Sequence, residues 1–266
     1  MLHQNILGWV KKLSSFKEVL PMIIDCNSFF GFWPHRQLTS NLASVRENAG
    51  SHGITNLVIC SLRGIFDDFV KGNDETLKAC AAHPELIPAA TINPHRWLGV
   101  DEEVDRLCSK GVKVFRFFPE YQHWPYRFQP FYSILERLEK ENAIAICPAR
   151  VGGHQNNGVI TELGELASRY DMTFIITGVY YGNLAEAIAV AKSCESILLE
   201  THLLNSPDGY EVLVSELGSH RIVYGSKAPL HPVSSSLLPL MKAGIGEEER
   251  ERILGGNIAK QLGWLT

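Results

Sequence analysis

The chain has 266 residues, of which 45% are hydrophobic and 20% are charged, and its formal net charge is -4. These values are typical of a globular protein and argue against a nucleic-acid or membrane partner. The uncharged apolar stretches are strand-sized, so none is long enough to span a bilayer. The six cysteines form no close pair, and Cys26, Cys60 and Cys147 lie in apolar strand-like runs. This pattern predicts buried free thiols in a reducing compartment, and hence a cytoplasmic location.

Eight short apolar runs alternate with stretches of helical period along the chain. The runs are apolar at successive positions, as buried parallel strands are. Amphipathic patterns between them predict helices at Pro130–Lys140, Gly158–Tyr170 and Asn183–Ser193. The predicted strands are Met22–Cys26, Asn56–Leu62, Leu86–Ile92, Val112–Phe118, Ala143–Cys147, Thr173–Thr177, Ser196–Thr201 and Arg221–Gly225.

The end of the chain and the number of units define the predicted fold. A helix that begins around Glu247 is expected to stop at Gly255-Gly256, and Asn257 is expected to cap the next helix, Ile258–Leu262. Eight β-α units in a chain of this length predict a (β/α)8 TIM barrel. A doubly wound open sheet is the alternative, although no Gly-x-Gly-x-x-Gly follows a strand. We expect a single barrel domain at residues 21–266, after a helical arm at residues 1–20.

Five segments, spread from the first predicted strand to the last helix, carry a family signal. They are Ile23-Ile24-Asp25 with Gly31, Ala89-Ala90-Thr91-Ile92-Asn93-Pro94, Gly111-Val112-Lys113-Val114-Phe115-Arg116 with Pro119, Arg221-Ile222-Val223-Tyr224-Gly225-Ser226 with Pro229, and Ile253-Leu254-Gly255-Gly256-Asn257. Together, in this order and at these distances, they resemble the amidohydrolase superfamily in its amidohydrolase-related, decarboxylase-like branch. The resemblance implies a TIM barrel and a hydrolase or lyase ancestry.

The metal ligands that the resemblance implies are replaced in this chain. The family pattern has histidines after strands one, five and six, and an aspartate after strand eight that takes the proton from metal-bound water. Phenylalanine cannot ligate a metal, and a lysine ammonium would repel a dication. We therefore expect a divergent subgroup without the usual metal, and no cofactor. The corresponding positions hold Asn27, Phe29, Cys147 or Pro148, Thr177 or Gly178, and Lys227.

Barrel enzymes place their chemistry at the carboxyl-terminal ends of the strands. The polar groups at those ends are Asn27, His35, Arg63, Asn93, His95, Arg116, Glu120, His123, Arg150, His154, Thr177, Glu200, His202, Lys227 and His231. We expect catalytic roles for four residues, which are Asp25, His35, His154 and Lys227. We expect five residues to bind the substrate, which are Asn27, Arg63, Arg116, Arg150 and His123.

Two expectations concern how these groups are arranged. Asp25, Asn27 and Phe29 share strand parity, so they should face one side, and a buried Asp25 should receive positive charge from Arg116 or Lys227. The aromatic residues near His123 are expected to line or cover a pocket. They are Tyr121, Trp124, Tyr126 and Phe128.

The crowded polar mouth favours an enzyme that acts on a small anionic substrate, as a hydrolase or lyase without the usual metal. Arg116, Lys227 and Arg63 would bind a carboxylate or phosphate, and His35 or His154 would exchange a proton. One alternative is a non-catalytic barrel that binds a small molecule or a protein partner. Another keeps a metal with new ligands among the histidines, Cys147 and the acidic groups. A homo-oligomer is compatible with each of these.

Overall fold

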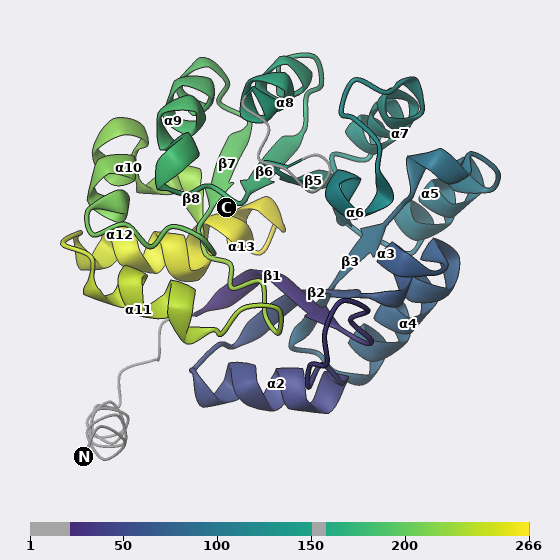
Figure 1. The fold of residues 1–266 in the computed structure, drawn as a ribbon, viewed down its shortest axis with the longest axis horizontal. Helices are drawn as coiled ribbons and strands as arrows, with labels where there is room; N and C mark the ends of the chain where they lie inside the picture. The colour runs from purple at the N-terminus through teal and green to yellow at the C-terminus, as the bar shows by residue number, and fades with distance from the viewer. Residues whose placement is uncertain (1–21, 151–157, 266) are drawn as a thin grey trace.

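The computed structural model describes residues 22–150 and 158–265 and forms a barrel of eight parallel strands surrounded by helices (Figure 1). The strands follow one another around the barrel in chain order, which confirms the predicted (β/α)8 TIM barrel. The arm expected at residues 1–20 lies outside the described residues. The strands are β1 Ile24–Phe30, β2 Asn56–Ser61, β3 Leu86–Thr91, β4 Val114–Arg116, β5 Ile144–Pro148, β6 Thr173–Thr177, β7 Ile197–Glu200 and β8 Ile222–Val223.

The barrel closes between β1 and the segment that contains β8. The backbone N–H of Cys26 donates to the carbonyl of Tyr224 at 3.0 Å, and that of Phe29 donates to the carbonyl of Ala228 at 2.8 Å. Closure removes the sheet edges that an open doubly wound sheet would leave. Strand β1 continues four residues beyond the predicted end at Cys26, and this extension brings the first two family ligand positions into the barrel wall.

Helices cover the outside of the barrel, as the amphipathic patterns predict. In α7 the apolar residues that recur at helical spacing are all buried, and they are Phe131, Ile134, Leu135 and Leu138. Across residues 22–150 and 158–265, no helix combines the length and the apolar character that a bilayer crossing requires. The helices are α2 Leu42–Ser51, α3 Arg63–Phe66, α4 Phe69–Ala82, α5 Val100–Ser109, α6 Pro119–Gln122, α7 Gln129–Lys140, α8 Val159–Ala167, α9 Leu184–Ser193, α10 Gly209–Leu217, α11 Ser234–Lys242, α12 Glu247–Glu251 and α13 Asn257–Gln261.

Two apolar clusters make up the core. One fills the barrel interior, with side chains such as Val58, Val114 and Ile175, and the other lies between the strands and the helices. All six cysteines are free, and the three that lie in strand-like runs are buried, as the sequence predicts. The interior cluster supports a polar layer at the carboxyl-terminal end of the strands, which is the end where barrel enzymes act.

The predicted helix stop at Gly255-Gly256 is wrong. The chain remains helical from α12 through a π-helical turn, η4 Arg252–Gly256, into α13. A Cβ at Gly255 would lie 2.2 Å from the carbonyl oxygen of Met22, so glycine is needed there for close packing and not for a turn. Asn257 does not cap a helix, because its Nδ2 donates to the carbonyls of Ser219 and Ile222, both at 2.7 Å.

Candidate active site

A β-bulge in β1 determines which side chains reach the mouth of the barrel. The pairing of β1 with β2 shifts between Asp25 and Ser28, so that Cys26 and Asn27 together stand opposite Val58. Two residues facing one define a bulge, which reverses the alternation of side chains beyond it. The bulge allows Asn27 to point into the barrel toward β4 and β7.

The expectation that Asp25, Asn27 and Phe29 face one side is therefore wrong. Asp25 pairs with Leu57, which belongs to the outer core. Phe29 pairs with Cys60, and both belong to the interior cluster. Asp25 thus lies on the outer side of the barrel wall, whereas Asn27 and Phe29 belong to the interior.

The fully buried carboxylate of Asp25 accepts four hydrogen bonds. The donors are the hydroxyl of Ser28 at 2.7 Å, the hydroxyl of Ser226, and the backbone N–H groups of Asn27 and Ser226, each at 2.9 Å. Burial raises the pKa of Asp25, and these hydrogen bonds oppose that increase. The carboxylate joins β1 to the segment after β8 and so fixes the backbone beside Lys227.

This arrangement differs from the expected ion pair. The contacts of Asp25 with described residues are hydrogen bonds from hydroxyl and backbone donors, and neither Arg116 nor Lys227 forms an ion pair with it in the described part of the chain. Because hydroxyl and amide donors satisfy the carboxylate, no cation is needed beside it. Asp25 is a positioning residue in this geometry.

Arg116, the last residue of β4, carries a buried guanidinium at the centre of the mouth. Its guanidinium carbon lies 3.9 Å from the ring centroid of Phe29 and 5.3 Å from that of Phe118. Its Nη2 donates to Asn27 Oδ1, while the buried Nη1 has no hydrogen-bond partner among the described residues. Burial lowers the pKa of Arg116, but a guanidinium remains protonated in a protein. The free N–H groups of Nη1 can therefore bind an anion.

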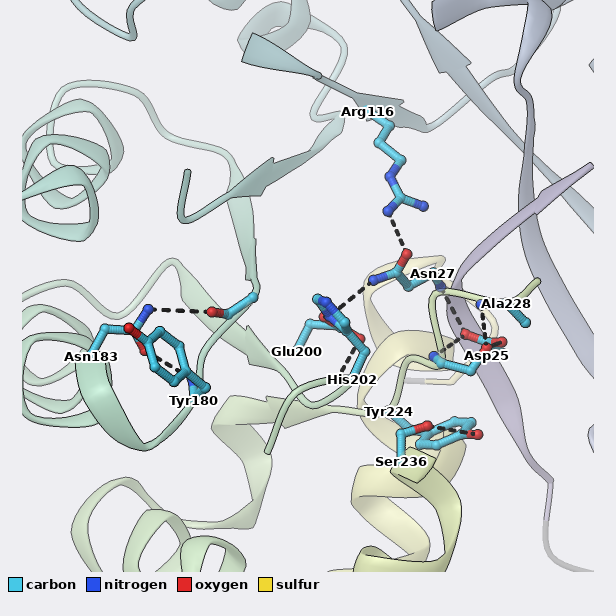
Figure 2. A network of polar contacts seen from close by, with 12 residues as sticks. Asp25, Asn27, Arg116, Tyr180, Asn183, Glu200, His202, Tyr224, Ala228 and Ser236 are labelled. Carbon is cyan, nitrogen blue, oxygen red and sulfur yellow. Dashed lines mark hydrogen bonds and ion pairs between the residues drawn. The ribbon is translucent and has the colours of Figure 1, made fainter. Parts of the chain in front are cut away.

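Glu200 and His202 form a buried pair next to Asn27 (Figure 2). His202 Nδ1 lies 2.6 Å from Glu200 Oε2, and the backbone N–H of His202 donates to Glu200 Oε1 at 2.9 Å. Asn27 Nδ2 is 3.4 Å from the same ring nitrogen. The shorter contact sets the tautomer, so Nδ1–H donates to the carboxylate. Nε2 then carries a lone pair, and this buried atom has no hydrogen-bond partner in the described part of the chain.

The charges of this pair follow from burial and from the neighbouring cations. Burial alone would raise the pKa of Glu200, but its interactions with His202 and a hydrogen bond from Asn27 together outweigh burial, so the pKa lies below its usual value. Burial lowers the pKa of His202, Glu200 opposes that decrease, and Lys227 and Arg116 add to it. At neutral pH the pair is thus an ionised carboxylate and a neutral imidazole, which can accept a proton at Nε2.

His231 lies against this pair. Its ring centroid is 5.4 Å from that of His202, in an edge-to-face arrangement. Burial first, and then the neighbouring His202 and Lys227, lower the pKa of His231 to about 4. This second imidazole is therefore also neutral at neutral pH.

Gly225 makes space for the carboxylate of Glu200. A Cβ at Gly225 would lie 2.1 Å from Glu200 Oε1 and 2.8 Å from the Cβ of Asn27. Real side chains do not approach so closely, so only glycine allows both groups to pack against this backbone. The glycine of the family segment thus has a local role in the site.

Lys227 and Glu120 bring a further pair of opposite charges to the mouth. Lys227 is half-buried, with a left-handed φ of 58°, and its ammonium makes no hydrogen bond or ion pair with the described residues. Glu120 lies on α6, and its Oε2 is buried without a hydrogen-bond partner among the described residues. Burial raises the pKa of Glu120 to about 6, against the opposing effects of Lys227, Arg116 and Arg150. Such unpartnered buried groups are typical of functional sites.

Two residues expected to bind the substrate lie at the surface instead. Arg63 is exposed, with Nε 3.0 Å from Asp67 Oδ2 and Nη1 2.9 Å from Glu75 Oε1. His123 is exposed at the end of α6. The ion pairs occupy the guanidinium of Arg63, and the His123 side chain is exposed to solvent. Neither residue therefore belongs to the central cluster.

The remaining predicted residues, His35, Arg150 and His154, differ in their relation to the central cluster. His35 is exposed, and its ring centroid lies 5.1 Å from that of Trp33 and 5.6 Å from that of Phe66. Arg150 is exposed after β5 and is close enough to Glu120 to lower the pKa of that carboxyl group. His154 lies outside the described residues. The structure thus brings together Asn27, Arg116, Arg150 and Lys227 from the predicted set.

The aromatic residues around His123 do not form one pocket lining. Trp124 and Tyr126 are fully buried in the outer core, and the Trp124 ring centroid is 4.9 Å from that of Phe131. Tyr121 belongs to a separate group with Trp33, at 5.4 Å between ring centroids. The expectation of an aromatic cover is therefore wrong for Trp124 and Tyr126, because their rings complete the core instead.

A cleft of about 240 Å³ lies beside the mouth, between α3 and α6. The central polar groups are not part of its wall, so the candidate site rests on their unpartnered buried atoms and not on this cleft. Its wall is formed by Gly64, Ile65, Phe66, Asp67, Phe69, Asn93, Arg96, Tyr121 and Gln122.

A protein-family comparison places these features in a known group. The family model described as amidohydrolase matches residues 56–264, which is more than half of the chain. The chain belongs to the amidohydrolase family. A comparison with curated proteins found no match.

Solved structures with the same fold include three decarboxylases. The 2,6-dihydroxybenzoate decarboxylase from Rhizobium is 12% identical, with a TM-score of 0.73, and the match covers 92% of this chain and 99% of that one. The 5-carboxyvanillate decarboxylase from Sphingomonas paucimobilis is 13% identical, with a TM-score of 0.70 and coverage of 91% and 99%. The dihydroxybenzoic acid decarboxylase from a Polaromonas species, which has bound manganese, is 12% identical, with a TM-score of 0.71 and coverage of 92% and 97%. At these identities the similarity establishes the shared fold.

The residues at the metal-ligand positions of this amidohydrolase do not fit a metal. Asn27 Oδ1 accepts a hydrogen bond from Arg116, and the ring of Phe29 lies under the same guanidinium. A cation at this place repels a dication, and phenylalanine has no donor atom. Within residues 22–150 and 158–265, no group of three or more His, Cys, Asp or Glu side chains is arranged to hold a metal ion. The buried guanidinium of Arg116 thus contacts two residues at the family's ligand positions, Asn27 and Phe29.

Sequence reasoning did not select three residues of the central cluster, although all three belong to the polar strand ends. They are Glu120, Glu200 and His202. A Glu-x-His at the end of the seventh strand is a usable signal, because this spacing lets one carboxylate accept both the backbone N–H and the ring N–H of the histidine. Nothing in the sequence next to Glu120 indicates a role in the site, because the cations that act on its carboxyl group follow or end other strands, β4, β5 and β8.

Proposed function

We propose that this amidohydrolase is an enzyme that binds a small carboxylate substrate at the mouth of the barrel and acts on it without the usual metal of the family pattern. The single observation that carries the proposal is the guanidinium of Arg116. The residue is 4% exposed, and the Nη1 of its guanidinium has no hydrogen-bond partner among the described residues. A buried cation with free donors is costly unless an anion completes its shell.

The surrounding groups supply the other requirements of a reaction. Asn27 holds Nη2 of Arg116, which leaves Nη1 directed at the substrate. His202, oriented by Glu200 through the 2.6 Å contact, would exchange a proton at Nε2. Lys227 brings a second basic nitrogen to the mouth, at the place where the family pattern has its proton-accepting aspartate. These roles replace the expected proton exchange by His35, which lies at the surface.

The similar structures support a carboxylate as the substrate and a lyase as the reaction class. These proteins are decarboxylases of dihydroxybenzoate and carboxyvanillate, which are aromatic carboxylates. Removal of a carboxylate requires a group that takes up an electron pair and a donor that protonates carbon. A hydrolase that recognises a carboxylate could use the same groups, so the reaction class is the second part of the test.

Titration calorimetry tests the binding site. Benzoate should bind the wild-type protein, whereas benzamide, its neutral analogue, should not. Arg116→Met should reduce benzoate affinity by at least tenfold, because a hydrogen bond to a charged group contributes about 1.5–3 kcal/mol. Arg63→Met is the matched control, since this arginine is paired at the surface and its loss should leave affinity unchanged. Equal losses in both variants, or none in either, would reject the site.

A screen of small carboxylates for release of CO2 tests the reaction class. Any activity should be abolished by Lys227→Ala and reduced by His202→Gln. If turnover persists in Lys227→Ala, the assignment of this lysine to the site is wrong.

A non-catalytic barrel remains the second candidate. It is favoured by the replacement of the ligands at all the family's metal positions, from Asn27 to Lys227. Under this candidate benzoate would still bind through Arg116, but His202→Gln and Lys227→Ala would change no reaction. Carboxylate binding without turnover over the full screen would favour it over the enzyme.

A further inference from the structure

Lys227 presents a primary amine that the protein does not use as a structural cation. Its ammonium has no hydrogen bond or ion pair with the described residues, although the side chain is half-buried. Its backbone has a left-handed φ of 58°, an uncommon conformation for a residue with a side chain. The neighbouring Ser226 is held by the carboxylate of Asp25 through both its N–H and its hydroxyl. These hydrogen bonds fix the backbone next to Lys227.

The groups that act on Lys227 come from four sides of the mouth. Burial is the largest influence on the pKa of Lys227 and lowers it. The cations Arg116 and Arg150 add to that decrease, and the carboxylates of Glu120 and Glu200 oppose it. A lysine is activated as a nucleophile by burial and by neighbouring cations, because both favour the neutral amine. The titratable and charged neighbours are Arg116, Glu120, Arg150, Glu200, His202 and His231.

We propose that Lys227 is a catalytic nucleophile that forms a Schiff base with the ketone of a β-keto acid whose carboxylate is held by Arg116. This inference deepens the proposed function and rests on it, since the carboxylate site is the same. It names the substrate class as small β-keto acids. It also assigns the uptake of the electron pair, which a metal would otherwise assist, to a protonated imine.

The steps balance with groups that the site supplies. The neutral amine adds to the keto carbon, and the carbonyl oxygen takes the proton that nitrogen loses. Glu120, in its acid form, protonates this oxygen, which leaves as water to give an iminium. The bond between the α-carbon and the carboxylate then breaks, CO2 leaves, and the electron pair moves to nitrogen to form an enamine. Protonation of carbon by a proton from solvent, followed by hydrolysis, releases the ketone and restores the amine.

Glu120 fits the role of the acid in this sequence. Its Oε2 is buried without a hydrogen-bond partner in the described part of the chain, so it can reach an incoming oxygen. Its pKa of about 6 allows both protonation states near neutral pH. The net reaction converts one β-keto acid anion and one proton into a ketone and CO2, and it requires no oxidant or reductant.

Reductive trapping tests the proposal on the whole chain. Acetoacetate and sodium cyanoborohydride are added to the wild-type protein, and the product is analysed by intact mass and peptide mapping. One adduct per chain is expected, on Lys227, and its mass shows that CO2 left before reduction. Because mapping of the wild-type protein identifies the lysine directly, the result does not depend on the folding of a variant.

Two variants serve as comparisons. Lys227→Arg keeps the charge but cannot form a Schiff base, so labelling should decrease by at least tenfold. Lys192→Arg removes a surface lysine that is paired with Glu216, and labelling should not change. Adducts spread over surface lysines, or no adduct at all, would overturn the proposal.

The same preparation separates this inference from the proposed function. If benzoate binds through Arg116 but acetoacetate leaves no adduct on Lys227, the nucleophile is rejected and the carboxylate site stands. If benzoate does not bind, the carboxylate site is rejected, and the nucleophile is rejected with it.

Discussion

The guanidinium of Arg116 lies over the ring of Phe29, with its carbon 3.9 Å from the ring centroid. Phe29 holds a position where the family pattern has a metal-binding histidine. A cation over an aromatic face is stabilised by about 0.5–2 kcal/mol, and more so when both groups are desolvated. One contact thus joins the residue at a family ligand position to a buried cation.

The carboxylate of Asp25 should stabilise the fold strongly. Asp25→Ala leaves four buried donors without an acceptor, from Ser28, Asn27 and Ser226, and should lower the free energy of unfolding by about 3–5 kcal/mol. Asp67→Ala is the control, because Asp67 is exposed and its ion pair contributes less than about 1 kcal/mol. Urea denaturation measures both. Similar losses for the two variants would contradict the positioning role.

Gly225 should tolerate no side chain. Gly225→Ala places a Cβ 2.1 Å from Glu200 Oε1, so the variant should lose about 1–3 kcal/mol and displace the carboxylate. Gly50→Ala, on α2, meets nothing within 4 Å and should gain about 0.5–1 kcal/mol through helix propensity. Thermal denaturation of the two variants gives the sign of each change. A stable Gly225→Ala protein that still binds benzoate would show that Glu200 does not need this space.

Glu120 should make the free energy of unfolding depend on pH. Its pKa is about 6 in the folded chain against 4.5 for the ordinary side chain, so the folded state holds the proton more tightly. The resulting stabilisation, about 2 kcal/mol, is fully present below pH 4.5 and is lost as the pH rises through 6.

The comparison with Glu120→Gln isolates this effect. Urea denaturation at pH 4 to 7 should show that the wild-type protein loses stability relative to the variant over this range. His231, whose pKa is lowered to about 4, causes the opposite trend, but both proteins contain it and the difference removes it. A difference that is flat, or that grows in the other direction, would contradict the burial of this carboxyl group.

The imidazole of His202 should be neutral at pH 7, with its proton on Nδ1. The 2.6 Å contact with Glu200 and the lowered pKa of the ring both favour this form. Nitrogen-15 NMR of histidine-labelled protein distinguishes the two ring nitrogens, and His202→Gln assigns the signal. Addition of benzoate should shift the Nε2 resonance. A protonated ring, or a proton on Nε2 at pH 7, would contradict the role of His202 as a proton acceptor.

The fold was predictable because its signals are local. Eight apolar runs and the helical stripe of α7 require no knowledge of distant contacts, and all of them are confirmed. The glycine pair at Gly255-Gly256 misled because glycine serves two purposes. The sequence does not distinguish a helix stop from close packing against the carbonyl of Met22.

The site was predictable only in part, because its contacts join distant segments. Arg116 and Lys227 follow from their positions at strand ends, but the bulge at Cys26 and Asn27 leaves no mark in an apolar run. If the bulge is not known, the alternation of side chains along β1 predicts that Asp25 faces the same side as Asn27, whereas it faces the outside of the barrel. Arg63 was wrongly predicted to bind the substrate because it follows a strand. Its ion pairs with Asp67 and Glu75 at the surface cannot be read from the sequence.

Benzoate titration of chelator-treated protein, with the wild type and Arg116→Met compared at one pH, tests the central claim most directly. If side-chain charge has replaced the metal, the wild type should bind benzoate equally well before and after treatment with a chelator, and Arg116→Met should lose at least tenfold in affinity. Affinity that disappears on chelation and returns with added zinc or manganese, with no effect of Arg116→Met, would contradict the account.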